Sequence, residues 1–260
     1  MKRIVIFSRI ILLVSLVYLY EYGLKEISKD VIKMVDNTTS NVTITIIYDN
    51  NEYDKRLKTA WGFSCLVELG DKKILFDTGS DSPTLLSNMK KLEIDPKKLD
   101  IIVLSHIHGD HTGGLTGLLK INPDVIVYIP KSFPDSFKDD IKLYGATFVE
   151  VTDSTKIFDG ILTTGELGTW IKEQSLIIKT EKGLVVITGC AHPGIVNIVK
   201  KAKELTKENV YLVLGGFHLF KADDVEIKKI IRSFKDLKVK KVAPCHCTGD
   251  KAISLFEKEY

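Results

Sequence analysis

The chain lacks an excess of charge of either sign. Its 37 basic and 34 acidic residues give a formal net charge of +3, whereas nucleic-acid-binding domains usually present a strongly basic surface. We therefore expect no nucleic-acid partner. The chain also lacks low-complexity tracts and fixed-period repeats, which excludes solenoid and propeller arrays. With 260 residues, 44% of them hydrophobic, it can form one large domain or two small ones with a sizeable core.

Cysteine is scarce. The four cysteines, Cys65, Cys190, Cys245 and Cys247, are too few for a disulfide scaffold in a chain of this length. Cys245 and Cys247 are separated by a single residue, and a disulfide across that spacing would be strained. We expect all four side chains to be thiols.

Long hydrophobic runs are confined to the N-terminal segment MKRIVIFSRIILLVSLVYLYEYG. A basic start precedes an apolar run from Ile10 to Tyr20, and no small-residue cleavage site follows it. We predict that residues 1–35 form an uncleaved hydrophobic helix that contacts a membrane through residues 4–20 and leaves the catalytic domain outside. A cleaved signal peptide and a helix on a cytoplasmic protein are the alternatives. Residues 36–41 are predicted to be a polar linker, and residues 42–260 the catalytic domain.

Hydrophobic patterning in residues 42–260 predicts an α/β protein. Alternating or continuous β-branched and apolar residues indicate strands at 42–48, within 63–79, and at 101–105, 125–130, 146–151, 161–167, 175–180, 183–189, 211–216 and 241–244. Helical spacing indicates helices at 82–91, 131–144, 194–205 and 222–235. Strands precede helices in each half of the chain, which predicts two mixed sheets packed together with helices outside, an αββα sandwich.

Histidine is also rare, yet three of the six histidines lie in the stretch LSHIHGDHTGG, directly after an apolar strand. In extended backbone His106 and His108 point to the same side, and Asp110 and His111 lie beyond the turn at Gly109. Neutral imidazole and carboxylate groups are ligands for zinc, iron and manganese. We predict one or two divalent metal ions here, with zinc favoured over manganese and iron.

The other three histidines, His192, His218 and His246, each follow an apolar strand. Ligands and catalytic groups collect where strands of a layered α/β protein end. We predict that His192 and His246 bind metal, whereas His218 either binds metal or acts in catalysis. Asp77, in ILFDTG, follows a strand too. It is predicted to hold a ligand imidazole through its second nitrogen, with a simple turn residue as the alternative.

The motifs FDTG, SHIHGDHTGG and TGC-A-H, with a late histidine at a strand end, resemble the metallo-β-lactamase superfamily over residues 45–250. The resemblance implies the αββα fold. Further segments, GFSCLVE, ITGCAHPGIVNIV, GGFHLF and PCHCTG, resemble one branch of metal-dependent hydrolases that includes an archaeal dihydropterin-condensing enzyme of methanopterin synthesis. The branch implies that His218 lies in the pocket, and it implies metal ligands at His106, His108, Asp110, His111, His192 and His246.

The chain departs from the superfamily at one position. Many members carry an aspartate that bridges two metals where this chain has Cys190. A thiolate can bind zinc or iron, so Cys190 is a predicted ligand. The alternative is a small buried apolar residue.

These patterns predict a metal-dependent enzyme that acts on a small molecule. A substrate that carries a phosphate group is compatible with them. In the favoured hypothesis it is a hydrolase in which metal-bound water attacks, with Asp110 and His218 as catalytic residues. The alternatives are a transferase of the dihydropterin type and a non-catalytic metal- or ligand-binding module. An extracytoplasmic location would count against the transferase, because pterin diphosphates are cytosolic.

Overall fold

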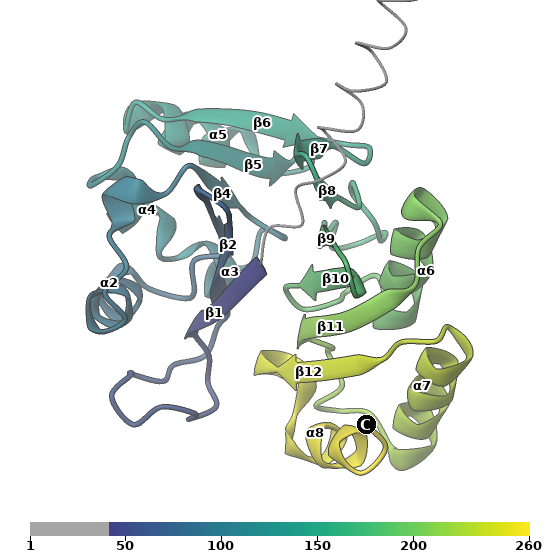
Figure 1. Ribbon diagram of the computed structural model, residues 1–260. Coiled ribbons are helices and arrows are strands. Elements are labelled where there is room, and N and C mark those ends of the chain that lie inside the picture. Colours follow the sequence, from purple (N-terminus) through teal and green to yellow (C-terminus); the bar gives the residue numbers. More distant parts are fainter. Residues whose placement is uncertain (1–41) are drawn as a thin grey trace, which may run out of the picture. The chain divides into compact units, whose positions relative to one another are not determined.

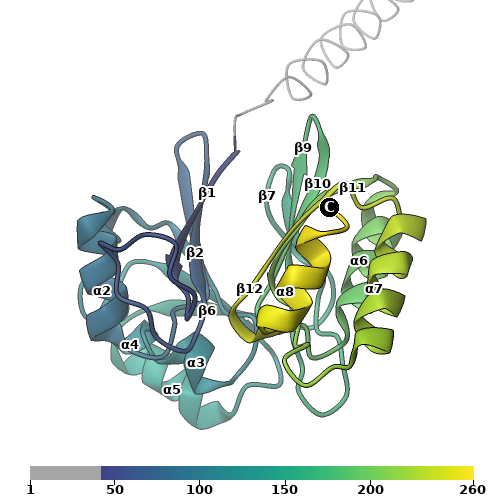
Figure 2. The ribbon, with the colours of Figure 1, turned by 90° about the horizontal axis from the view of Figure 1, so that it is seen from below.

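A computed structural model describes residues 42–260 (Figures 1 and 2). The first of its two six-stranded sheets has the order β1-β2-β3-β4-β5-β6, and the second has the order β12-β11-β10-β9-β8-β7. The first sheet comprises β1 (Val42–Tyr48), β2 (Ser64–Leu69), β3 (Lys72–Phe76), β4 (Ile101–Val103), β5 (Ile126–Pro130) and β6 (Thr147–Val151). The second comprises β7 (Lys156–Phe158), β8 (Ile161–Thr163), β9 (Leu176–Thr180), β10 (Gly183–Thr188), β11 (Val210–Gly216) and β12 (Lys241–Cys245).

The helices lie on the outer faces of the two sheets (Figure 2). Beside the first sheet are α2 (Ser82–Lys91), α3 (Gly109–Thr112), α4 (Leu115–Leu119) and α5 (Asp135–Leu143), and beside the second are α6 (Ile195–Thr206), α7 (Asp224–Asp236) and α8 (Asp250–Glu257). Short 3-10 turns follow at Pro96–Lys98 and His246–Thr248. Asp81 caps the N-terminus of α2. Its side chain accepts a hydrogen bond from the Thr84 N–H, one of the N–H groups that have no partner within the helix.

Three apolar cores separate these layers, as expected for an αββα sandwich. The period of two along a strand sends alternate side chains to opposite faces. In β3, for example, Ile74 and Phe76 enter the core between the sheets, whereas Leu75 joins the core under the outer helices. The third core lies between the second sheet and α6, α7 and α8. The predicted sandwich is therefore confirmed for residues 42–260.

Element boundaries differ from the predictions where turn chemistry intervenes. The strand predicted at 101–105 ends at Val103, because Ser105 turns to bond with Asp77. The strand predicted at 161–167 ends at Thr163, before Gly165 at φ +77°. The helix predicted from residue 131 begins at Asp135, since Pro134 holds an extended conformation before it.

The predicted membrane location is wrong. Within residues 42–260, none of the helices combines the length and the apolar character needed to cross a membrane. Spanning takes about 20 consecutive apolar residues, and the run from Ile10 to Tyr20 on which the prediction rested has eleven, with Arg9 directly before it. That run, the hydrophobic helix predicted for residues 1–35 and the linker at 36–41 all lie outside the described residues.

Candidate metal centre

All the predicted site residues follow strands that run parallel to a neighbour. In the first sheet Asp77 follows β3, and the stretch from His106 to His111 follows β4. In the second sheet Cys190 and His192 follow β10, His218 follows β11 and His246 follows β12. The carboxyl ends of parallel strands meet at one edge of a sheet. The two sheets therefore bring these segments together although they are far apart in the sequence.

His106, His108 and His192 form the first set of potential metal ligands, because one ligand atom of each lies within 4.8 Å of the other two. Nε2 of His106 and Nδ1 of His108 are 3.1 Å apart. Two nitrogens at zinc-ligand distance from one tetrahedral ion are about 3.3 Å apart. Nε2 of His192 is buried and has no hydrogen-bond partner in the described part of the chain. A buried nitrogen without a partner is costly, and a metal ion would supply the partner.

The second set joins the two halves of the protein and comprises Asp110, His111, Cys190 and His246. Nε2 of His111 lies 3.2 Å from the Cys190 Sγ and 3.6 Å from the Asp110 Oδ2. Nε2 of His246 lies 3.3 Å from the same carboxylate oxygen. These separations are of the order expected between ligands of one ion. The structure thus brings together all seven predicted ligands, in two sets that fit two metal ions.

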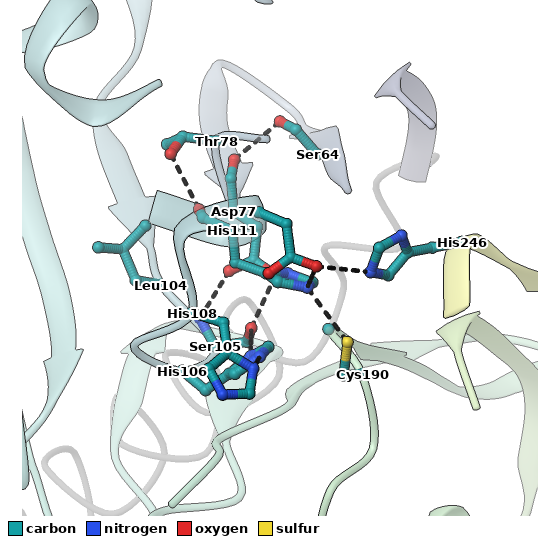
Figure 3. A network of polar contacts seen from close by, with 12 residues as sticks. Ser64, Asp77, Thr78, Leu104, Ser105, His106, His108, His111, Cys190 and His246 are labelled. Carbon is teal, nitrogen blue, oxygen red and sulfur yellow. Dashed lines mark hydrogen bonds and ion pairs between the residues drawn. The ribbon is translucent and has the colours of Figure 1, made fainter. Parts of the chain in front are cut away.

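Neighbouring side chains fix the orientation of these rings (Figure 3). The buried Asp77 carboxylate accepts a hydrogen bond of 2.6 Å from His111 Nδ1 and one of 2.7 Å from the Ser105 hydroxyl. The Ser105 hydroxyl is in turn 2.9 Å from His106 Nδ1. Asn50 Oδ1 lies 2.9 Å from His246 Nδ1. Each partner occupies one ring nitrogen and leaves Nε2 to face the site, which is the arrangement around metal-bound histidines.

The ionisation states suit metal binding. Burial lowers the pKa of His106 well below its usual range and lowers the pKa of His192 to about 4, so both rings are neutral at pH 7 and offer lone pairs. Burial opposes the charge on Asp110, but contacts with neighbouring imidazoles still lower its pKa well below its usual range. Burial also opposes a charge on His111, but the Asp77 carboxylate raises the pKa of His111. A cation bound at Nε2 would replace that proton.

One residue that organises the site, Glu173, was not predicted from the sequence. Its buried carboxylate accepts four backbone hydrogen bonds from the loop after β10, at Oε1 from Gly189, Cys190 and Ala191, and at Oε2 from His192. Oε1 also accepts the hydroxyl of Thr188. Glu173 therefore holds the backbone of the loop that carries two predicted ligands.

Gln174, the next residue, holds the other half of the site. Its side-chain amide donates a 2.9 Å hydrogen bond to the carbonyl of Leu104, and its N–H donates to the carbonyl of Ser105. These carbonyls directly precede His106. Glu173 and Gln174 are consecutive residues shortly before β9. They form hydrogen bonds to the candidate metal-binding loops of both sheets and so hold the two loops together.

Backbone strain is concentrated around the site. Seven non-glycine residues among 42–260 have positive φ. Three of them, Glu93, Lys207 and Lys238, follow the C-terminal ends of helices, where such a conformation is common. The other four are site residues, with φ of +57° at Asp77, +60° at Ala191, +54° at His218 and +47° at His246. Conformations of this kind cost about 1 kcal/mol or more each and are typical of functional sites.

Gly189, in the second half of the protein, lies directly against Ser105 and Asp77 of the first half. A Cβ at this position would be 2.1 Å from the Ser105 hydroxyl oxygen and 2.9 Å from Asp77 Oδ2. We expect Gly189→Ala to lower stability by about 1–3 kcal/mol, as overpacking does, and to lower metal content by displacing the loop. Thermal denaturation and metal analysis measure both effects. Gly109→Ala is the matched control, because a Cβ there meets no atom within 4 Å; equal losses in both variants would contradict this account.

The protein is a sandwich of two sheets, and its H-x-H-x-D-H loop contributes residues to both ligand sets. These features together are typical of one class of metal-dependent enzymes. A family model described as the metallo-beta-lactamase superfamily matches residues 62–246. The chain belongs to this superfamily, so the resemblance inferred from the motifs is confirmed.

The relatives include enzymes and proteins without a known activity. The chain is 37% identical to the 7,8-dihydropterin-6-methyl-4-(β-D-ribofuranosyl)-aminobenzene-5'-phosphate synthase of Methanocaldococcus jannaschii, over 83% of this chain and 90% of the relative. It is 33% identical to an uncharacterized protein of the same organism, over 81% and 92% of the two chains. Among crystal structures, Tm1679, a metal-dependent hydrolase of the β-lactamase superfamily, superimposes with a TM-score of 0.71 at 31% identity, covering 85% of this chain and 93% of that one.

Proposed function

We propose that the chain is a metal-dependent transferase of the dihydropterin-condensing type, acting on a phosphorylated small molecule. The reaction joins a pterin methylene carbon to an aryl acceptor. The C–O bond to the diphosphate breaks, the diphosphate keeps the electron pair, and the acceptor loses a proton. The similarity to the M. jannaschii synthase supports this choice, since it extends over nearly the full length of both chains. The correction of the predicted membrane location removes the objection to it.

The single observation that carries the proposal is an exposed aromatic pair beside the metal ligands. Trp61 and Phe220 come from opposite halves of the protein and are 51% and 47% exposed, with ring centroids 6.5 Å apart. The Trp61 ring lies 5.0 Å from the His246 ring. Planar rings stack on exposed aromatic side chains, and exposed apolar side chains that lie together mark binding surfaces more often than single ones do. The two rings are nearly perpendicular, at 80°, so the face of one ring can stack on a flat substrate such as a pterin while the other ring contacts its edge.

A cavity with two lysines in its wall adjoins the other ligand set. This cavity of about 480 Å³ along α6 is lined by His192, Lys200, Lys201 and Glu204 among other residues. Lys201 pairs with Glu204 at 3.2 Å, and Lys200 carries the cavity's unpaired positive charge among the described residues. Ammonium groups attract phosphate, so this cavity suits a phosphorylated substrate. Divalent ions bound by the two ligand sets would supply Lewis acids for the leaving diphosphate. Asp110 would remain an anionic ligand, and the histidine rings would be held in place by Asp77, Ser105 and Asn50.

A hydrolase is the second candidate. The similarity to Tm1679 favours it, and the same ligand sets can hold a metal that activates water. Zinc is the favoured ion for either reaction, on the chemistry of a histidine, carboxylate and thiol ligand set.

The two reactions are separated by one assay. The full-length protein, loaded with zinc or manganese, is incubated with hydroxymethyl-dihydropterin diphosphate, and diphosphate release is followed with and without an aminobenzene ribofuranosyl phosphate. Release that depends on the acceptor supports the transferase. Release that ignores the acceptor supports the hydrolase. Absence of release from a protein that has bound metal would refute both for this substrate.

Trp61 is testable by itself, because the chain contains only two tryptophans. In a Trp170→Phe protein the remaining fluorescence comes from Trp61, and we expect a pterin ligand to quench it. Trp61→Ala should weaken binding of that ligand roughly 2- to 10-fold, the loss of one aromatic stack. Trp170→Ala, at a position 95% exposed, is the control. Equal affinity in the two alanine variants would remove the aromatic pair from the binding site.

A further inference from the structure

Two thiols and an imidazole gather at one end of the second sheet. Cys190, His218 and Cys247 follow three adjacent parallel strands, β10, β11 and β12. One ligand atom of each, including both sulfurs, lies within 4.8 Å of the other two. Cys65 and Cys245, the other two cysteines, belong to the core between the sheets and to none of the potential ligand groups found in residues 42–260.

The local backbone is arranged to admit this cluster. Gly216, at the end of β11, has no Cβ, and a Cβ there would lie 2.6 Å from the Cys247 Sγ. Two residues later His218 adopts its left-handed conformation, with φ +54°. Cys190 and Cys247 are buried, at 3% and 2% exposure, but His218 is exposed. The cluster therefore combines two buried sulfurs with an imidazole that is exposed to solvent.

We propose that Cys190, Cys247 and His218 form a separate site for a thiophilic divalent cation, zinc or cadmium in type. Two thiolates and one imidazole are a ligand set that such ions prefer, and binding would release the thiol protons to solvent. The site adjoins the second ligand set, because the Cys190 Sγ lies 3.2 Å from the His111 Nε2. The Cys190 sulfur is thus positioned to be shared between two ions.

Of the two roles predicted for His218 from the sequence, metal binding and catalysis, this assignment selects metal binding. It differs from simple packing of thiols in the core, because the cluster includes an exposed polar ring held in a strained conformation. It is also independent of the reaction catalysed, since neither substrate takes part. A negative result in the diphosphate assay therefore has no bearing on the proposed cation site.

The test uses cobalt(II) as a probe, added to the metal-free full-length protein with a non-thiol reductant. Each cobalt–thiolate bond adds charge-transfer absorption in the near ultraviolet. Cys247→Ala should reduce this absorption by about one third to one half, because it removes one of two cobalt–thiolate bonds, or one of three where the Cys190 sulfur binds two ions. Cys245→Ala is the matched control, since Cys245 is equally buried at 2% exposure and lies two residues away. His218→Ala should weaken cobalt binding at the sulfur site without removing either sulfur.

Two results would overturn the proposal. One is unchanged charge-transfer absorption in the Cys247→Ala protein. The other comes from the unaltered protein titrated with cadmium-113, whose resonance position reports the number of sulfur ligands. A two-sulfur resonance is expected, and resonances of only nitrogen- and oxygen-bound or one-sulfur cadmium would contradict the site. This second measurement remains decisive if the Cys247 variant does not fold.

Discussion

Glu173→Gln is expected to cost the protein on the order of 3 kcal/mol of stability and most of its metal affinity. The native carboxylate accepts five hydrogen bonds and donates none. An amide of the same shape replaces one acceptor oxygen by an NH₂ group that points at backbone N–H groups. Hydrogen bonds to a charged group contribute roughly 1.5–3 kcal/mol each, and a buried donor left without a partner costs about 1–3 kcal/mol.

The effect on metal binding follows from which backbone N–H groups lose their hydrogen bonds to Glu173. The N–H groups bonded to Glu173 include those of Cys190 and His192, two of the predicted ligands. Loss of a group that orients ligands typically reduces metal affinity about 10- to 100-fold. We expect weaker binding at both ligand sets, since each contains one residue of this loop. Isothermal titration with zinc measures the affinities, and urea denaturation of the metal-free protein measures stability separately.

Glu166→Gln is the matched control for this prediction. Glu166 accepts one backbone hydrogen bond, of 2.7 Å from Ser132, and an amide oxygen can accept the same bond. Its loss of stability should be below about 1 kcal/mol, and its zinc affinity should equal that of the native protein. A Glu173→Gln protein that matched the Glu166→Gln protein in both measurements would show that the loop holds its shape without the carboxylate.

Glu173 also shows what sequence patterns could not reveal. The six histidines were found because strand-end positions and their spacing point to metal chemistry. Asp77 was found because it follows a strand. Glu173 lies 15 to 19 residues before its partners, and those partners are chiefly backbone N–H groups, which every residue carries. The sequence therefore offers no complementary side chain that would mark Glu173 as a partner of this loop. Only the folded structure shows its hydrogen bonds.

The fold was more accessible to prediction than the element ends. Continuous apolar runs such as Ile74, Leu75 and Phe76 identify strands with both faces buried, and two groups of such strands predict a sandwich. Boundaries depend on single bonds that cross the structure, such as that from the Ser105 N–H to Asp77. The grouping of ligands into two sets also needed the fold, because the sets draw on loops up to 136 residues apart, from Asp110 to His246.

His108→Ala and His246→Ala are expected to remove different metal ions. His108 belongs to the set with His106 and His192, and His246 belongs to the set with Asp110, His111 and Cys190. Each substitution deletes one ligand nitrogen, and we expect it to weaken its own ion at least about a hundredfold, more than the loss of an orienting neighbour does. Diphosphate release should fall by a similar or larger factor in both variants, because the two sets border one reaction site.

The two variants serve as controls for each other. Metal content after dialysis against limiting zinc should fall by about one equivalent in each, if each set holds one ion as its ligand number permits. The ions that remain should differ between the two variants, so cobalt added to the His108→Ala protein should still show thiolate charge transfer from Cys190 and Cys247. Full metal retention in either variant would remove that histidine from the ligands. Loss of all metal in both would mean that the two sets bind cooperatively and that neither ion is held without the other.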